Sequence, residues 1–242
     1  MNGVVLVIRR ELAQYFRTWS GYGFVALLLA LTGLLYNAFA VGKSAKYSAD
    51  VLSDYLYLAS GTTMAAALFL SMRTLAEERQ TGSYPLLASS PLTDGQVVVA
   101  KFFSAYAVVG LYILSTLYMP ALVFVNGSVS LGHIFAGYVG LFAVGAAATG
   151  IGVFGSAVAR SQLFAIIISA VILVVLLAVW LAASLADGAI GDVLGYLALH
   201  NKHFRPFMEG RIGLSHLVYY FSITLVFLTL ARNVLEARRW RS

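Results

Sequence analysis

Apolar residues along the chain gather into six long runs, separated by shorter polar stretches. The runs cover residues 22–41, 55–76, 102–125, 134–158, 163–185 and 214–231. An α-helix rises about 1.5 Å per residue, so about 20 apolar residues are enough to cross the core of a bilayer. Backbone groups in lipid must find partners within their own segment, which favours helices, and the alternating segments of an outer-membrane barrel do not occur. The pattern predicts an all-α integral membrane protein with six transmembrane helices.

Composition supports the same class. The chain has 242 residues, of which 60% are hydrophobic and 11% charged, and its mean hydropathy is +0.86. Globular proteins are about 45–50% apolar and about 25% charged. A body of 26.0 kDa could not enclose this much apolar surface in water, and disordered chains have the opposite balance of hydropathy and charge. We therefore expect a single membrane domain, residues 1–242.

A polar and aromatic stretch, residues 4–19, precedes the first run. It interleaves apolar side chains with Arg9, Arg10 and Glu11, which predicts a basic amphipathic elbow helix lying in the inner membrane interface. Residues 38–40 (Ala-Phe-Ala) fit a signal-cleavage pattern, but the long leader and Glu11 argue against cleavage.

The basic residues are unevenly divided between the two sides of this topology. With both termini in the cytoplasm, eleven of the sixteen Lys and Arg residues lie on the cytoplasmic side, whereas the ten acidic residues divide equally. Cytoplasmic loops carry an excess of Lys and Arg. We therefore expect both termini to be cytoplasmic, and we attribute the net charge of +6 to orientation in the membrane and not to nucleic-acid binding.

The longest cytoplasmic link, residues 77–101, has internal structure. Glu77-Glu78-Arg79 should continue the second helix, and Thr81-Gly82 should end it, because Gly permits a left-handed C-cap. Ser90-Pro91 should start a helix, with Ser as N-cap and Pro at the first helical position. Leu86 and Leu87 lie between these signals and suit docking into a groove of a partner. The alternative is a loop packed on its own bundle.

The outer segment before the sixth run, residues 186–213, is long for a connection without a role. It suits a substrate gate, a docking surface for an extracytoplasmic partner, or a lid on the bundle. All four histidines fall on the outer side, and His200 and His203 have a spacing that could bind a transition metal. No carboxylate or thiol completes such a set, so we assign no metal ligand and keep a metal-delivery permease only as a weaker alternative.

Two motifs resemble nucleotide-binding sequences. Residues 37–44 (NAFAVGKS) lack the first glycine of a P-loop and end a membrane span. Residues 150–155 (GIGVFG) match G-x-G-x-x-G but lie inside an apolar run, where small residues allow close helix approach. We expect neither to bind a nucleotide.

The interiors of the last four runs contain no charged residue. Transport coupled to an ion gradient usually needs ionisable groups inside the membrane, so the sequence argues against such coupling. The chain has no Cys and no G-x-S-x-G motif, and no His lies deep enough to act as a general base. We therefore expect no enzyme activity and no bound cofactor in this chain, and we expect its energy to come from another subunit.

The order of parts resembles the permease subunit of type-2 ABC exporters. The shared features are the amphipathic N-terminal helix, the six spans and a second-to-third link that reads Glu77-Glu78-Arg79-Gln80-Thr81-Gly82-Ser83 and later Leu86-Leu87-Ala88-Ser89-Ser90-Pro91. The outer segment, with His203-Phe204, Phe207 and Gly210-Arg211, is similar to the gliding-motility-associated group of these permeases. Tyr84-Pro85 departs from the usual link, where an apolar residue and an acid follow.

The resemblance implies two permease copies around a central pathway, in the inner membrane of a prokaryote. Separate cytoplasmic ATPase subunits, which bind ATP and Mg²⁺, would drive the pair through the link as a coupling helix. By matching position, the ATPase contacts would be Glu77, Glu78, Arg79, Gly82, Leu86, Leu87 and Pro91, with a second contact at Arg160. The partner or gate residues would be His203, Phe204, Phe207, Gly210 and Arg211. An alternative is a force-transmitting or assembly module, in which the ATPase acts on an extracytoplasmic or auxiliary membrane subunit and nothing is translocated.

Overall fold

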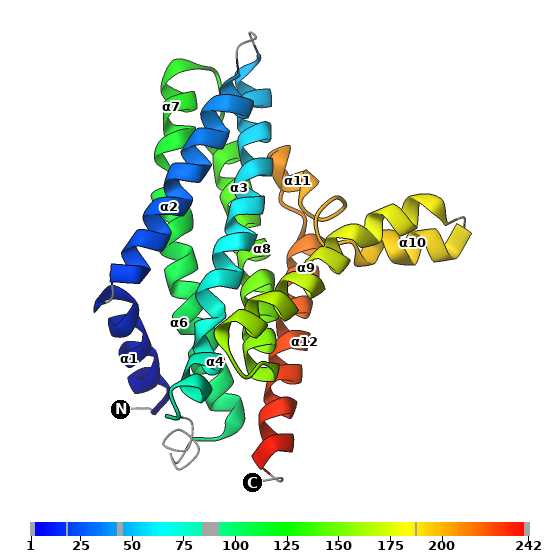
Figure 1. The fold of residues 1–242 in the computed structure, drawn as a ribbon. Coiled ribbons are helices and arrows are strands. Elements are labelled where there is room, and N and C mark those ends of the chain that lie inside the picture. Colours follow the sequence, from blue (N-terminus) through cyan, green and yellow to red (C-terminus); the bar gives the residue numbers. More distant parts are fainter. Residues whose placement is uncertain (1–2, 18, 43–45, 84–91, 187, 240–242) are drawn as a thin grey trace.

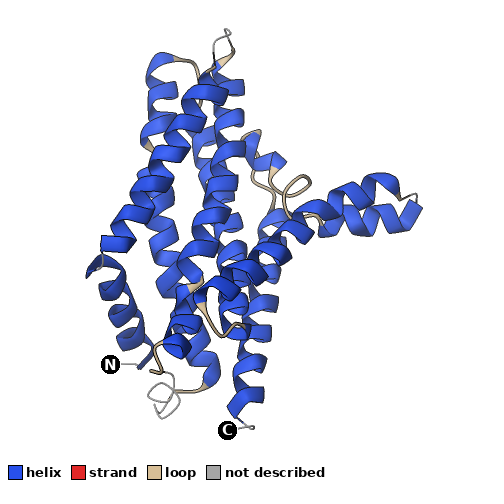
Figure 2. Cartoon of the chain, in the orientation of Figure 1, coloured by secondary structure: helices blue, strands red, loops and turns tan. Residues whose placement is uncertain are grey.

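The computed structural model describes residues 3–17, 19–42, 46–83, 92–186 and 188–239, and every regular element in these ranges is a helix (Figures 1 and 2). Six helical segments are long and apolar enough to cross a membrane. They are Gly21–Val41, Ser48–Gln80, Asp94–Val125, Leu131–Val158, Gln162–Leu185 and Leu214–Arg239. Each contains the whole of one predicted run, which confirms the six-span prediction. The second and third helices extend beyond their apolar runs at the ends where the link begins and ends.

The first described helix is α1 (Gly3–Arg17), which lies beside the base of the bundle and covers most of the stretch where the sequence predicts an elbow helix. It continues into α2 (Trp19–Leu35), whose last turns widen into the π-helix η1 (Tyr36–Val41). Both ends of the chain lie at the same end of the bundle (Figure 1). We call this the inner end and the opposite one the outer end.

Two spans are each made of two helices. The second span is α3 (Ser48–Ser71), followed by α4 (Arg73–Gln80) after a break at Met72. The third is α6 (Asp94–Ser115), followed by α7 (Tyr118–Asn126). Pro120 lies in the first turn of α7 and has no N–H to continue the hydrogen bonding of α6.

The ends of the link follow the sequence signals in part. α4 continues through Arg79 and ends before Gly82, whose φ of +73° is left-handed, which confirms the predicted stop. The predicted restart at Ser90 and Pro91 lies outside the described residues. α6 begins at Asp94 with a capping box, in which Thr93 and Gln96 bond each other's backbone N–H groups.

The central helix is α8 (Leu131–Val158), which packs against α3, α6, α9 and α12. A Cβ on Gly152 would overlap the side chain of Ser71 on α3, and one on Gly155 would overlap Ser169 on α9. The glycine pattern of residues 150–155 therefore serves close helix approach.

After α8 the chain leaves the bundle. α9 (Gln162–Leu185) leans away from the other spans (Figure 1), and only Ala165, Ser169 and Leu173 of it are buried. α10 (Gly188–Leu197) then runs back along α9, and the N–H of Leu199 donates to the carbonyl of Leu176 at 3.1 Å. The segment 186–213 is thus not wholly a connecting loop, because its first part is an apolar helix.

The segment 186–213 ends with α11 (Arg205–Met208), and α12 (Leu214–Arg239) returns the chain to the inner end.

Candidate functional site

The break between α3 and α4 is held by a serine on α8. The hydroxyl of Ser156 accepts from the N–H groups of Leu75 and Ala76, each at 2.9 Å, and donates to the carbonyl of Met72 at 3.0 Å. A side chain inserted into the hydrogen bonds of a helix in this way causes a kink. Because both backbone donors are buried, losing the hydroxyl would leave them unpaired. The start of α4 is therefore fixed to α8.

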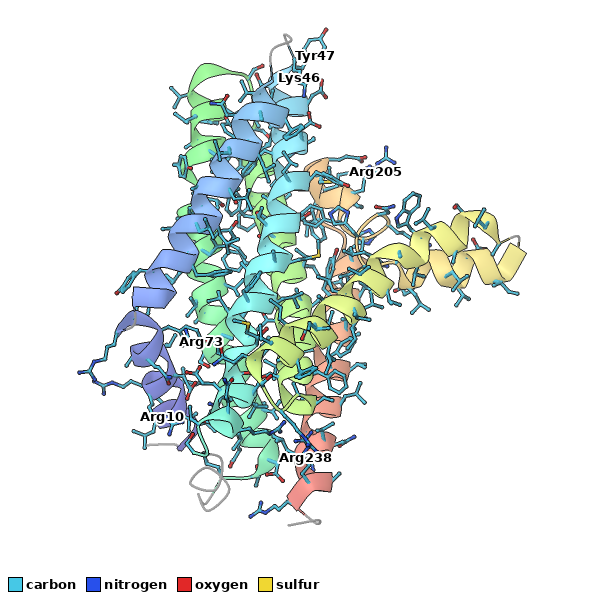
Figure 3. The ribbon with its side chains drawn as sticks, viewed as in Figure 1. Arg10, Lys46, Tyr47, Arg73, Arg205 and Arg238 are labelled. Atoms are coloured by element: carbon cyan, nitrogen blue, oxygen red, sulfur yellow. The ribbon has the colours of Figure 1, made fainter. Side chains whose placement is uncertain are left out.

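The second anchor of α4 is a buried cluster of charges shared with α1 and α6. Lys101, on α6, is 1% exposed, and its Nζ lies 2.6 Å from Oε1 of Glu78 on α4 and 3.0 Å from Oε1 of Glu11 on α1. The guanidinium of Arg10 closes the group from the surface, at 3.1 Å from Glu78 and 3.0 Å from Glu11 (Figure 3). Two carboxylates thus face two cations where three helices meet.

The surroundings of this cluster are polar and tightly filled. The hydrogen bond to Glu11 raises the pKa of Arg10. A cavity of about 30 Å³ lies beside the cluster, and Glu78, whose second oxygen Oε2 has no hydrogen-bond partner among the described residues, lines it. Its size and polar lining suit one ordered water molecule. Nearby, the hydroxyl of Tyr15 donates to the carbonyl of Leu70 at 2.6 Å, and burial raises the Tyr15 pKa.

Arginines bind the inner end of α8. Nη1 of Arg79, at the end of α4, donates to the carbonyls of Ala157 and Ala159, each at 2.6 Å. Arg238, on α12, donates to the carbonyl of Val158 at 2.6 Å. The last carbonyls of a helix have no partner within it and carry partial negative charge, so cations stabilise them. Through these contacts α4 and α12 are both bound to α8.

The predicted ATPase-contact residues differ in their placement. Glu77 pairs with Arg73 at 3.0 Å, whereas Glu78 and Arg79 face the interior of the protein and bind other helices. Gly82 and Arg160 are exposed at the inner end. Leu86, Leu87 and Pro91 lie outside the described residues. The described part of the link therefore shows how α4 is held, and its tip is where we expect a partner.

Sequence analysis missed Lys101, Glu11 and Ser156 as parts of this site. By sequence, Lys101 stands at the end of the predicted link, just before the third apolar run, and Glu11 stands in the predicted amphipathic helix. The signal in the sequence was that Lys101 and Glu11, which have opposite charges, each lie close to an apolar run. The sequence does not show that they pair, because the pairing depends on how the helices pack.

The predicted outer residues mostly face inward. His203, Phe204 and Phe207 are no more than 1% exposed, so they form part of the core. Gly210 has a φ of +77° and lies against His133, while the exposed Arg211 pairs with Glu209. In this structure the segment packs as a lid. Among the described residues no group of three or more His, Cys, Asp or Glu side chains is placed to hold a metal ion.

Comparison with curated proteins found no significant match to this chain. A family model described as "ABC-2 family transporter protein" matches residues 5–239, nearly the whole length. That range includes nearly all of α1, all six spans and the link between the second and third spans. The chain therefore belongs to the ABC-2 transporter family of membrane proteins.

Proposed function

We propose that the chain is the non-catalytic permease subunit of an ATP-driven exporter in the inner membrane of a prokaryote. Two copies pair around a central pathway, and separate cytoplasmic ATPase subunits, which hold ATP and Mg²⁺, drive them through the link of residues 77–101. Permeases of the ABC-2 family work with such ATPase subunits, and the expected pairing, direction and coupling extend that family role to this chain.

The observation that carries the proposal is the anchoring of α4. Lys101 ties α4 to the elbow helix and to the start of α6, and Ser156 ties it to α8. At the other end of the link, Asp94 lies 3.7 Å from Arg239 of α12. A push on the tip of the link would therefore reach α1, α6, α8 and α12 together. A loop that only joined two spans would not need buried ion pairs on its flank.

The first test is association with the ATPase. We expect the double variant Leu86→Asp, Leu87→Asp to lower recovery of the ATPase in co-purification at least tenfold, because two charges would enter an apolar contact. The matched control is Leu185→Asp, Ile190→Asp, whose side chains are 86% and 68% exposed at the far tip of the α9–α10 pair. The control should retain the ATPase. Equal recovery from the two variants would show that the link is not the contact.

The force-transmitting alternative is favoured by one observation, the exposed basic side chains of the lid. Arg205 and Arg211 have side chains that are 78% and 74% exposed. Deleting the lid would not test this alternative, since Phe204 and Phe207 belong to the core. Charge reversal at Arg205 and Arg211 is the better test. If the alternative holds, the variant should lose binding of the extracytoplasmic partner and keep the ATPase bound.

A further inference from the structure

All four histidines of the chain contact one surface segment, the outer lid, which we define as residues 199–213. Two of them, His200 and His203, belong to the lid, His133 lies on α8, and His216 lies on α12. The core side of the lid is apolar, since Phe204 and Phe207 are fully buried. The histidines provide polar contacts around these two buried phenylalanines.

Two of these contacts tolerate a protonated imidazole. Nε2 of His133 lies 2.6 Å from the carbonyl of Met208, which only accepts, so the ring must donate. Nε2 of His200 lies 2.7 Å from the hydroxyl of Ser60, whose own proton goes to the carbonyl of Tyr57. Both rings donate already, and protonation would leave these bonds in place, while burial lowers the pKa of His200.

The contact between His203 and His216 is different. Nε2 of His203 lies 2.8 Å from the carbonyl of Tyr196, so this nitrogen carries the ring proton. Nδ1 of His203 must then accept, and Nδ1 of His216, 3.0 Å away, must donate. The ring of His203 also stacks on Tyr219 with 3.7 Å between centroids and 4° between planes. The closed pair can take up one proton, but two would place N–H groups and positive charges against each other.

We propose that the outer lid is a latch released by acid. His203 and His216 can bind two protons when they are apart, but in the closed lid the pair can bind only one. Opening then takes up one proton. Below the ordinary imidazole pKa of about 6.5, the ratio of open to closed lid rises about tenfold for each unit of pH. Well above that pH the open form does not bind the second proton either, and the latch keeps its full strength.

The groups around His203 favour the neutral pair. α12 presents His216, Tyr219 and Tyr220, α10 presents Tyr196, and the lid itself presents Lys202. Burial lowers the pKa of His203, the hydrogen bond to the carbonyl of Tyr196 offsets part of this, and the charges of His216 and Lys202 lower the pKa further. The lid's carboxylate, Glu209, pairs with Arg205 and Arg211. Within the described ranges no histidine forms an ion pair with a carboxylate that would hold a second proton.

The test measures the distance between the lid and the top of α3 as a function of pH. The chain has no Cys, so spin labels at Arg205→Cys and Tyr47→Cys report only that distance, and both side chains point outward (Figure 3). In the full chain in lipid nanodiscs we expect one distance at pH 8. As the pH falls from 6.5 to 5, a second distance should appear, and its population relative to the first should rise about tenfold for each pH unit.

Two histidine variants separate the latch from other causes. In His216→Asn the amide can donate to His203 or, when flipped, accept from it, so the part of the pH dependence that comes from the pair should be lost and the response should fall well below that of the wild-type chain. His133→Asn should leave it intact. The latch is overturned if the distance is constant from pH 8 to 5, or if His216→Asn keeps the full response of the wild-type chain. A matching change between labels at Tyr22→Cys and Leu163→Cys, at the inner end, would indicate general unfolding and would equally overturn it.

Discussion

Replacing Lys101 with Met should lower the free energy of unfolding by about 3–5 kcal/mol, because it removes the buried cation shared by Glu11 and Glu78 and leaves two carboxylates against the exposed Arg10 alone. Lys101 is 1% exposed and is the closest cation to Glu78, at 2.6 Å. The measurement is an unfolding titration in mixed micelles, with the wild-type chain alongside. ATPase stimulation by the variant should fall with its stability, because α1 and α4 no longer move together.

The control is the same substitution in an exposed pair. Lys46 lies 2.7 Å from Asp54, but the two side chains are 29% and 48% exposed. Lys46→Met should cost no more than about 1 kcal/mol. Adding Glu78→Gln to Lys101→Met should restore part of the lost stability, since one uncompensated charge is removed. Equal costs at Lys46 and Lys101, or no recovery in the double variant, would contradict the account of the buried cluster.

Replacing Phe207 with Ala should also lower the free energy of unfolding, by about 3–5 kcal/mol, because it leaves a cavity under the lid. The side chain is fully buried and packs directly on α8, where a Cβ on Gly140 would lie 2.7 Å from it. The same unfolding titration measures the effect.

Phe221→Ala on α12 is the matched control for this change. The Phe221 side chain is 65% exposed, so lipid or detergent fills the space that it leaves, and the cost should be about 0.5 kcal/mol or less. A small cost at Phe207 would show that the lid is not part of the core.

The spans were predictable from sequence because each is a continuous apolar run whose backbone satisfies itself, whatever its neighbours are. The end of α4 at Gly82 was predictable for a similar reason, since the glycine conformation is local. The role of Lys101 was not, because its partners Glu11 and Glu78 lie on other helices. The lid shows the same limit. His200 and His203 are close in sequence, yet His203 pairs with His216, which the return of α12 brings beside it.

α10 was missed because its apolar stretch is too short to read as a span and follows directly on α9. A short apolar run could equally be a loop against the bundle, and only the packing of α10 along α9 decides between them.

We expect the membrane spans, as distinct from the outer lid, to move only when an ATPase acts through the link. The direct measurement places spin labels at Tyr22→Cys and Leu163→Cys, on the first turns of α2 and α9, in the permease–ATPase complex in nanodiscs. The account predicts that trapping ATP changes this distance in the intact complex. It predicts no change without the ATPase or with Leu86→Asp, Leu87→Asp. An equal change driven by an ion gradient across proteoliposomes that contain the permease alone would contradict the claim.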